Sequence, residues 1–177
     1  MKENKKPDVN DPENSFGSSI YFLVSTLGRA DSFSQHVDTQ SNILIGVSTA
    51  IFAFAATKFG AHREFLFFDI LGFFSALSAI FALLATHPPK FVRKKGQAES
   101  LMYNKKIVEF SSPAKYEHEL SGIMATKEKI TQQYATEIYN MYKYYYRPKR
   151  ELYKISRNTL LLGIFLSFIV GTLSMVI

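Results

Sequence analysis

The sequence predicts an all-α integral membrane protein, a helical bundle with three transmembrane helices plus cytoplasmic amphipathic helices. The last nineteen residues, 159–177, contain no charge and no proline. At a rise of about 1.5 Å per residue they reach roughly 28 Å, close to the thickness of the hydrocarbon core of a bilayer. Two further apolar runs, 43–57 and 65–86, lie close together in the chain. The 177 residues include no Cys, which excludes disulfides and thiolate metal sites.

The N-terminal part contains a polar tail and one predicted helix. Residues 1–10 are polar and charged and are predicted to be disordered. Asp11, Pro12 and Glu13 then supply a capping residue, a proline at the first helical position and an acid in the first turn. Apolar residues recur at steps close to three and four up to residue 37, which predicts a cytoplasmic amphipathic helix over 11–37. Its apolar face either packs against another helix or lies on the membrane surface.

Residues 38–86 are predicted to form a transmembrane helical hairpin. The run 43–57 is short for a span, and it reaches full length if residues 39–42 lie in the headgroup region. The loop between the two spans, 58–64, is so short that the spans must be antiparallel neighbours. The His87-Pro88-Pro89 sequence ends the second span, because residues before a proline disfavour helix.

Residues 87–157 are predicted to be a basic, Tyr-rich cytoplasmic helical segment. Residues 87–158 contain fifteen Lys and Arg against seven Asp and Glu, and nine of the ten Tyr lie between residues 103 and 153. Residues 90–98 form a basic linker. Two short apolar runs, 101–103 and 107–110, either form a small hairpin or dock on the helices.

The second half of this segment is predicted to be helical and to continue into the third span, residues 158–177. Ser112 and Pro113 give a hydroxyl cap and a proline in the first turn. Gly122 marks a bend or break, and Pro148 marks a kink. Because residues 90–157 hold fifteen basic residues and the 58–64 loop holds two, the N-terminus and residues 87–157 are predicted inside and the C-terminus outside.

No catalytic constellation is recognisable in the sequence. The four His have no ligand spacing, and neither a Gly-rich phosphate loop nor a GxSxG elbow is present. The sequence therefore predicts no catalytic residues and no metal site, and the chain is not expected to be an enzyme.

Small residues line one face of the third span. Gly163, Ser167 and Gly171 are four residues apart, so they share a helix face. Small side chains at this spacing let membrane helices approach closely, either within one bundle or between copies of the chain.

A basic stripe precedes the third span at steps of four, three, four and three: Lys143, Arg147, Arg150, Lys154 and Arg157. Like charges at this spacing repel, so an anionic partner is expected. The anionic inner leaflet is one candidate, and a phosphorylated small ligand is the other. Tyr142 and Tyr146 lie beside these cations and are candidates for stacking on a base. Nucleic acid is not expected as a partner, since phosphate-binding proteins do not need flanking apolar spans.

A polar pair, Asp38 and Asn42, lies at the inner mouth of the first span. The two residues are four apart and share a helix face. They are expected at the same depth as Lys154 and Arg157, which predicts an ion pair between the first and third spans. The alternative is a polar cap that simply ends the span.

Residues 38–46, with the sequence DTQSNILIG, resemble the D-x-K-A-N-x-x-L-G opening of the first span in Pycsar-type transmembrane effectors. These are bacterial anti-phage membrane proteins that respond to cyclic mononucleotides. The Pro88-Pro89 exit and the stretches 101–103 and 138–139 are also similar, so the resemblance covers residues 15–177. The chain departs from the family at Gln40, where Lys is usual, and at Pro148, which interrupts a helix that the family keeps unbroken.

The resemblance implies a membrane-disrupting effector of an anti-phage defence system in the bacterial inner membrane. A cyclic pyrimidine mononucleotide, cCMP or cUMP, from a partner cyclase would activate a homo-oligomer and halt growth of the infected cell by abortive infection. No cofactor is implied beyond this ligand. The alternative is a small inner-membrane anchor or scaffold whose cytoplasmic helices recruit a protein partner.

Overall fold

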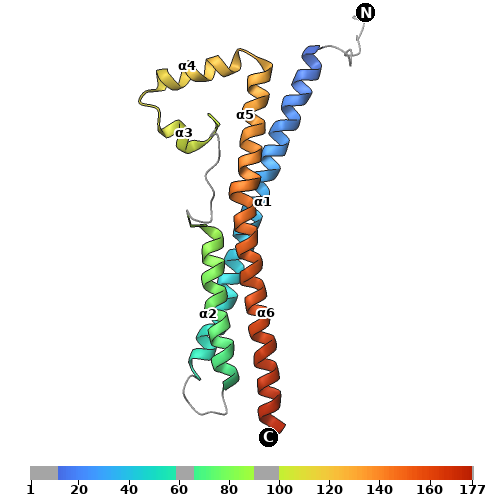
Figure 1. Cartoon of the computed structure of the whole chain (residues 1–177), viewed down its shortest axis with the longest axis vertical. Helices are drawn as coiled ribbons and strands as arrows, with labels where there is room; N and C mark the ends of the chain where they lie inside the picture. The colour runs from blue at the N-terminus through green and yellow to red at the C-terminus, as the bar shows by residue number, and fades with distance from the viewer. Residues whose placement is uncertain (1–11, 59–65, 90–99, 177) are drawn as a thin grey trace, which may run out of the picture. The chain divides into compact units, whose positions relative to one another are not determined.

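The computed structural model describes residues 12–58, 66–89 and 100–176, and these residues form helices and turns without any strand (Figure 1). Three stretches are long and apolar enough to cross a membrane: Phe16–Ala56, Leu66–Thr86 and Lys127–Ser174. The all-α class and the three membrane-length helices are therefore confirmed. The predicted disorder of 1–10, most of the 58–64 loop and the 90–98 linker lie outside the described residues.

The chain divides into two compact units. The first unit comprises residues 1–32 and 95–143, and the second comprises residues 33–94 and 144–177.

The first helix, α1, runs unbroken from Pro12 to Ala56. The prediction that an amphipathic helix ends near residue 37 and a separate span follows is wrong. The polar stretch after residue 37 remains helical, and its side chains form hydrogen bonds within the helix. Thr39 Oγ1 donates to the Gln35 carbonyl oxygen at 3.0 Å, and Gln40 Nε2 lies 2.9 Å from His36 Nε2.

The second helix, α2, runs from Leu66 to Thr86 and ends before His87-Pro88-Pro89, as predicted. It packs along α6 (Arg147–Val176) within the second unit (Figure 1). These two helices and the part of α1 after residue 32 make up the described core of that unit.

The first unit contains three shorter helices, α3 (Asn104–Val108), α4 (Pro113–Met124) and α5 (Lys127–Asn140). The predicted start of α4 is confirmed: Ser112 is extended and its Oγ accepts a hydrogen bond from the Lys115 amide at 3.4 Å. Residues 104–108 form a helix, so the hairpin alternative is wrong. The break comes at Ala125 and Thr126 and not at Gly122, because Thr126 adopts an extended backbone at the N-cap position of α5.

A π-helix, η2 (Met141–Tyr146), joins α5 to α6 without interruption, so the predicted continuation into the third span is confirmed. Pro148 is the second residue of α6, where its missing amide hydrogen breaks the regular α-helical bonding pattern. The wider i to i+5 bonding of the π turn lies directly before it. The kink predicted at Pro148 stays a prediction, and the irregularity observed here is the π-helix that ends two residues before Pro148.

Buried small residues determine how the helices of the second unit pack. On α1 they repeat every seven residues: Ser34, Ser41, Ser48 and Ala55. On α2 the buried positions are Gly72, Ser75, Ser78, Ala82 and Ala85. Seven-residue spacing keeps one side of a helix against its neighbours, and small side chains allow the close backbone approach typical of membrane bundles.

Candidate functional site

A cluster of three serines joins all three helices of the second unit. Ser78 Oγ on α2 lies 3.0 Å from Ser48 Oγ on α1 and 3.1 Å from Ser156 Oγ on α6. Ser156 Oγ donates to the Ser78 carbonyl oxygen at 2.7 Å, and Ser78 Oγ donates to the Ser156 carbonyl oxygen at 3.0 Å. Since each hydroxyl has one hydrogen, Ser48 is left to donate to Ser78 Oγ. All three side chains are fully buried, so the cluster is a satisfied polar network inside the bundle.

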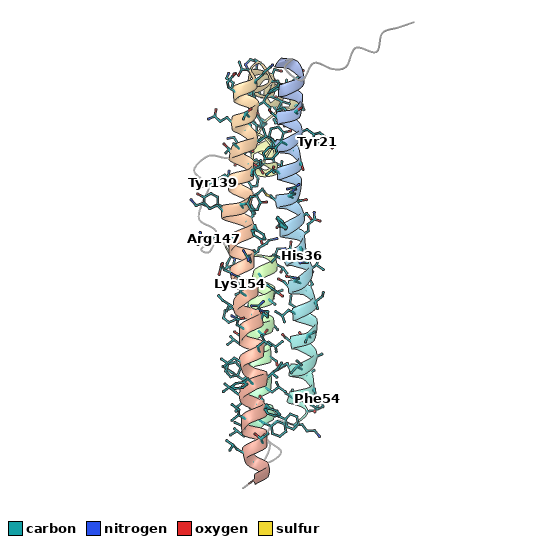
Figure 2. All side chains as sticks on the ribbon, turned by 90° about the vertical axis from the view of Figure 1, so that its right-hand side faces the viewer. Tyr21, His36, Phe54, Tyr139, Arg147 and Lys154 are labelled. Carbon is teal, nitrogen blue, oxygen red and sulfur yellow. The ribbon has the colours of Figure 1, made fainter. Side chains whose placement is uncertain are left out.

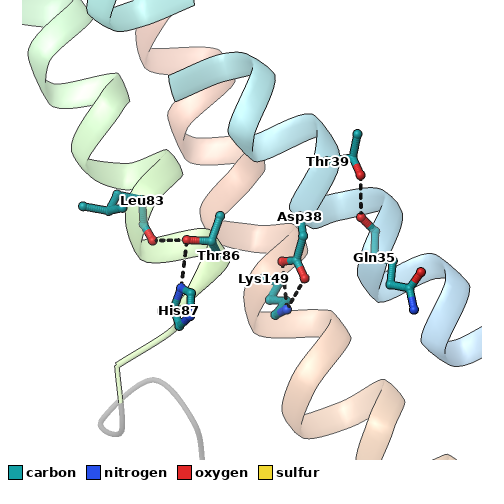
Figure 3. A network of polar contacts seen from close by, with 7 residues as sticks. All are labelled: Gln35, Asp38, Thr39, Leu83, Thr86, His87 and Lys149. Carbon is teal, nitrogen blue, oxygen red and sulfur yellow. Dashed lines mark hydrogen bonds and ion pairs between the residues drawn. The ribbon is translucent and has the colours of Figure 1, made fainter. Parts of the chain in front are cut away.

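An ion pair between α1 and α6 lies about two to three turns from the serine cluster. Lys149 Nζ donates to both carboxylate oxygens of Asp38, at 2.8 and 2.7 Å (Figure 3). Side-chain exposure is 12% for Lys149 and 36% for Asp38, so the lysine is the more deeply buried partner. The pair holds the first and third membrane helices together, because separating it would leave a charge on each helix without its partner.

The predicted ion pair between the first and third spans exists, but its basic partner is Lys149 and not Lys154 or Arg157. Lys154 lies 3.6 Å from Glu151 on its own helix, and Arg157 Nη2 donates to Asn158 Oδ1 at 3.2 Å. Asn42, the second member of the predicted pair, is exposed.

Lys149 is not among the charges spaced by three and four, so that pattern does not single it out. A different signal was available. Lys149, Ser156 and Gly163 are seven residues apart on α6, the same repeat as the buried serines of α1, so they share the face that packs inside the bundle.

The small-residue face of the third span points toward α2. A Cβ atom added at Gly163 would overlap the Cβ of Phe74, and one added at Gly171 would lie 3.7 Å from Phe67 Cγ. Ser167 is buried, and its Oγ donates to the Gly163 carbonyl oxygen at 2.7 Å. This face is therefore occupied by α2 of the same chain.

Four of the five basic residues of the predicted stripe, Arg147, Arg150, Lys154 and Arg157, keep steps of three and four within α6. Lys143 lies in η2, where the turn is wider than the about 3.6 residues of an α-helix. Lys143 and Tyr142 belong to the first unit, whereas Tyr146 and the other four cations belong to the second. Within the second unit Arg147, Arg150 and Arg157 are exposed, and Figure 2 labels Arg147 and Lys154 on α6. The Arg150 guanidinium lies 6.0 Å from the centre of the Tyr146 ring.

In the first unit a buried carboxylate ties residues 100–101 to α5. Ser100 Oγ donates to Glu137 Oε2, and both residues are buried. The Leu101 amide donates to Gln133 Oε1 at 2.9 Å. A polar cleft of about 450 Å³ lies between α4 and α5, lined by His118, Glu119, Lys129 and Gln133 among others.

Replacing Ser100 by Ala is expected to loosen the start of this segment. The Glu137 carboxylate would lose its hydroxyl donor while it remains buried, at a cost of about 1–3 kcal/mol. Amide hydrogen exchange of residues 100–110 should therefore become faster. The control is Glu137→Gln, which keeps an acceptor oxygen without the charge and should protect these amides better than Ser100→Ala. Equal exchange in Ser100→Ala and the parent would contradict the role of this contact.

Comparison with known proteins identifies the family. The family model described as the Pycsar effector protein domain matches residues 22–176, which is most of the chain. The chain belongs to the Pycsar effector family. No curated protein and no solved structure matches it. As a Pycsar effector with three membrane-length helices, the chain has an anti-phage effector role and is a membrane protein.

The match includes every residue of the arrangement described above. The Asp38–Lys149 pair, the serine cluster and the Gly163 contact all lie within residues 22–176. Among the described residues of this Pycsar effector, an ion pair, a hydroxyl network and a close backbone approach thus each connect membrane-length helices.

Proposed function

We propose that this Pycsar effector is activated by a cyclic pyrimidine mononucleotide, cCMP or cUMP, and then impairs the integrity of the bacterial inner membrane so that infected cells stop growing. The chain acts without catalysing a reaction, in line with the absence of a catalytic motif in the sequence. In the proposed topology the N-terminus and residues 87–157 are cytoplasmic and the C-terminus is outside, as the distribution of Lys and Arg favours.

The observation that carries the proposal is the unbroken helix from Lys127 to Ser174. Its first part is polar and Tyr-rich, and its second part is a membrane-length apolar stretch. A ligand that moves the polar part acts directly on a helix that crosses the bilayer. Arg150 and Arg157 are exposed at the start of the apolar part, which suits binding of phosphate groups from a nucleotide or a lipid. Activation is proposed to involve several copies of the chain.

The proposal predicts depolarisation that depends on the nucleotide. Membrane potential is measured with a potential-sensitive dye in cells that express this chain with or without a pyrimidine cyclase. Depolarisation is expected only when both are present. No depolarisation in either case, with the chain shown to be in the membrane fraction, would contradict the proposal and favour an anchor that recruits a protein partner.

Reversing two of the exposed cations tests where the phosphate binds. Arg150→Glu with Arg157→Glu is expected to weaken the response at least tenfold, since each basic residue near anionic groups contributes roughly 1 kcal/mol. Arg150→Lys with Arg157→Lys keeps the charge and serves as the control. Binding of cUMP to the purified protein in neutral detergent distinguishes a nucleotide site from a lipid site. If the two arginines bind the nucleotide, the reversed variant loses cUMP binding. If they bind lipid, its cUMP binding is unchanged. An unchanged response of the reversed variant would remove both arginines from the mechanism.

A further inference from the structure

The second unit contains a series of buried hydroxyl groups along the helix contacts, called here the serine column: Ser41 and Ser48 on α1, Ser75 and Ser78 on α2, and Ser156 on α6. All five side chains are fully buried. A bundle that only needed close packing could use Ala or Gly at these positions, as it does at Ala55 and Ala82. The hydroxyls therefore need an explanation beyond the size of the side chain.

Two hydroxyls of the serine column have no hydrogen-bond partner among the described residues. They are Ser41 Oγ and Ser75 Oγ. An unsatisfied hydroxyl is costly in an apolar environment, and in the membrane no bulk solvent is available to compensate. Water is the ligand that suits such a position, since it is small and both donates and accepts hydrogen bonds.

The serine column has a polar feature at one end and a cavity at the other. Asp38 precedes Ser41 by one turn on α1, and its partner Lys149 precedes Ser156 by two turns on α6. At the other end an open cavity of about 680 Å³, lined mainly by apolar side chains, lies between α1, α2 and α6. Leu71, one turn before Ser75, lines this cavity, together with Ser167 and Gly171. The column therefore leads from a charged entrance into a space between the same three helices.

We propose that Ser41 and Ser75 bind water inside the closed bundle, and that the serine column is the polar lining of the path by which small ions cross the membrane when the effector is activated. This inference rests on the proposed function, because it specifies how the membrane loses its integrity. The ligand of the column is water, and through the water, small hydrated ions.

The hydrogen-bond energies of the serine cluster favour opening of this path when the effector is activated. The hydrogen bonds of Ser48, Ser78 and Ser156 join neutral groups, and interhelical bonds of this kind contribute only about 0.6 to 2 kcal/mol in membrane bundles. When the helices part, water replaces protein partners at small cost. An apolar core at this position would instead expose its side chains to water and oppose opening.

The absence of Cys makes the test direct, because a single Ser→Cys variant carries the only thiol of the chain. Ser48→Cys and Ser78→Cys are reconstituted in liposomes, with Thr49→Cys as the matched control, since Thr49 neighbours Ser48 and is exposed. A charged, membrane-impermeant thiosulfonate reagent is added with and without cUMP or cCMP. Labelling rate and dissipation of an imposed membrane potential are recorded together.

With nucleotide, labelling at both column positions is expected to accelerate at least tenfold, within the range of about 5- to 150-fold typical of effector coupling, and labelling is expected to alter the ion flux. Labelling of Thr49→Cys should change less than about twofold and leave the flux intact. If the nucleotide dissipates the potential while it accelerates the labelling of Ser48→Cys and Ser78→Cys no more than that of Thr49→Cys, the path does not follow the column and the proposed function stands. If the parent chain dissipates no potential with either nucleotide, both proposals fail.

Discussion

Lys149→Asp is expected to depolarise the membrane in the absence of any cyclic nucleotide. The substitution places two carboxylates at a contact where Lys149 Nζ now lies 2.7 and 2.8 Å from the carboxylate oxygens of Asp38. Breaking a buried ion pair is strongly unfavourable, and here the cost is about 2 kcal/mol, reduced because Asp38 is 36% exposed. That free energy corresponds to roughly a thirtyfold shift from the closed toward the open bundle. Potential-sensitive dyes in cells without a cyclase measure this directly.

The ion pair provides its own control. Asp38→Lys combined with Lys149→Asp restores opposite charges in reversed order, so nucleotide-dependent behaviour should return. Lys149→Arg keeps the charge and should resemble the parent chain. All variants are compared at equal amounts in the membrane fraction. If the double variant depolarises cells as strongly as Lys149→Asp alone, the two residues are not coupled, and the ion pair does not hold the bundle closed.

The membrane helices could be predicted from the sequence, whereas the boundary at residue 37 was predicted wrongly. Hydropathy is summed over some twenty residues, so a span remains recognisable despite local irregularity. The change from polar to apolar side chains near residue 38 was interpreted as the end of a helix. Backbone hydrogen bonds do not depend on that change, and Thr39 bonds to the carbonyl oxygen of Gln35 within the continuous helix α1.

The site could be predicted only in part, because it depends on which helix faces meet. Asp38 was selected correctly as an ion-pair member from its position at the mouth of the first span. Its partner Lys149 required knowledge of the buried face of α6, on which Lys149, Ser156 and Gly163 lie seven residues apart. The serine cluster joins residues up to 108 positions apart, Ser48 and Ser156 through Ser78, and no spacing rule connects them.

Gly163→Ala is expected to disrupt the packing of α2 against α6, whereas Gly171→Ala is expected to be tolerated. A methyl group at Gly163 would overlap Phe74 Cβ and lie 3.0 Å from Phe74 Cγ, both atoms near the α2 backbone. At Gly171 the nearest atom, Phe67 Cγ, is 3.7 Å away, an ordinary contact. Overpacking a tight site costs about 1–3 kcal/mol. The thermal stability of the two purified variants in the same detergent measures the difference.

The identity of the overlapping atom defines a second, sharper test. Phe74→Ala should not rescue Gly163→Ala, because alanine keeps the Cβ that causes the overlap, whereas Phe74→Gly should restore part of the lost stability. Equal melting temperatures for Gly163→Ala and Gly171→Ala would show that α2 and α6 do not approach closely here. Because Gly163 is on the same face of α6 as Ser156, a methyl group that separates these helices also weakens the serine cluster. Gly163→Ala should therefore lower the nucleotide concentration needed for depolarisation.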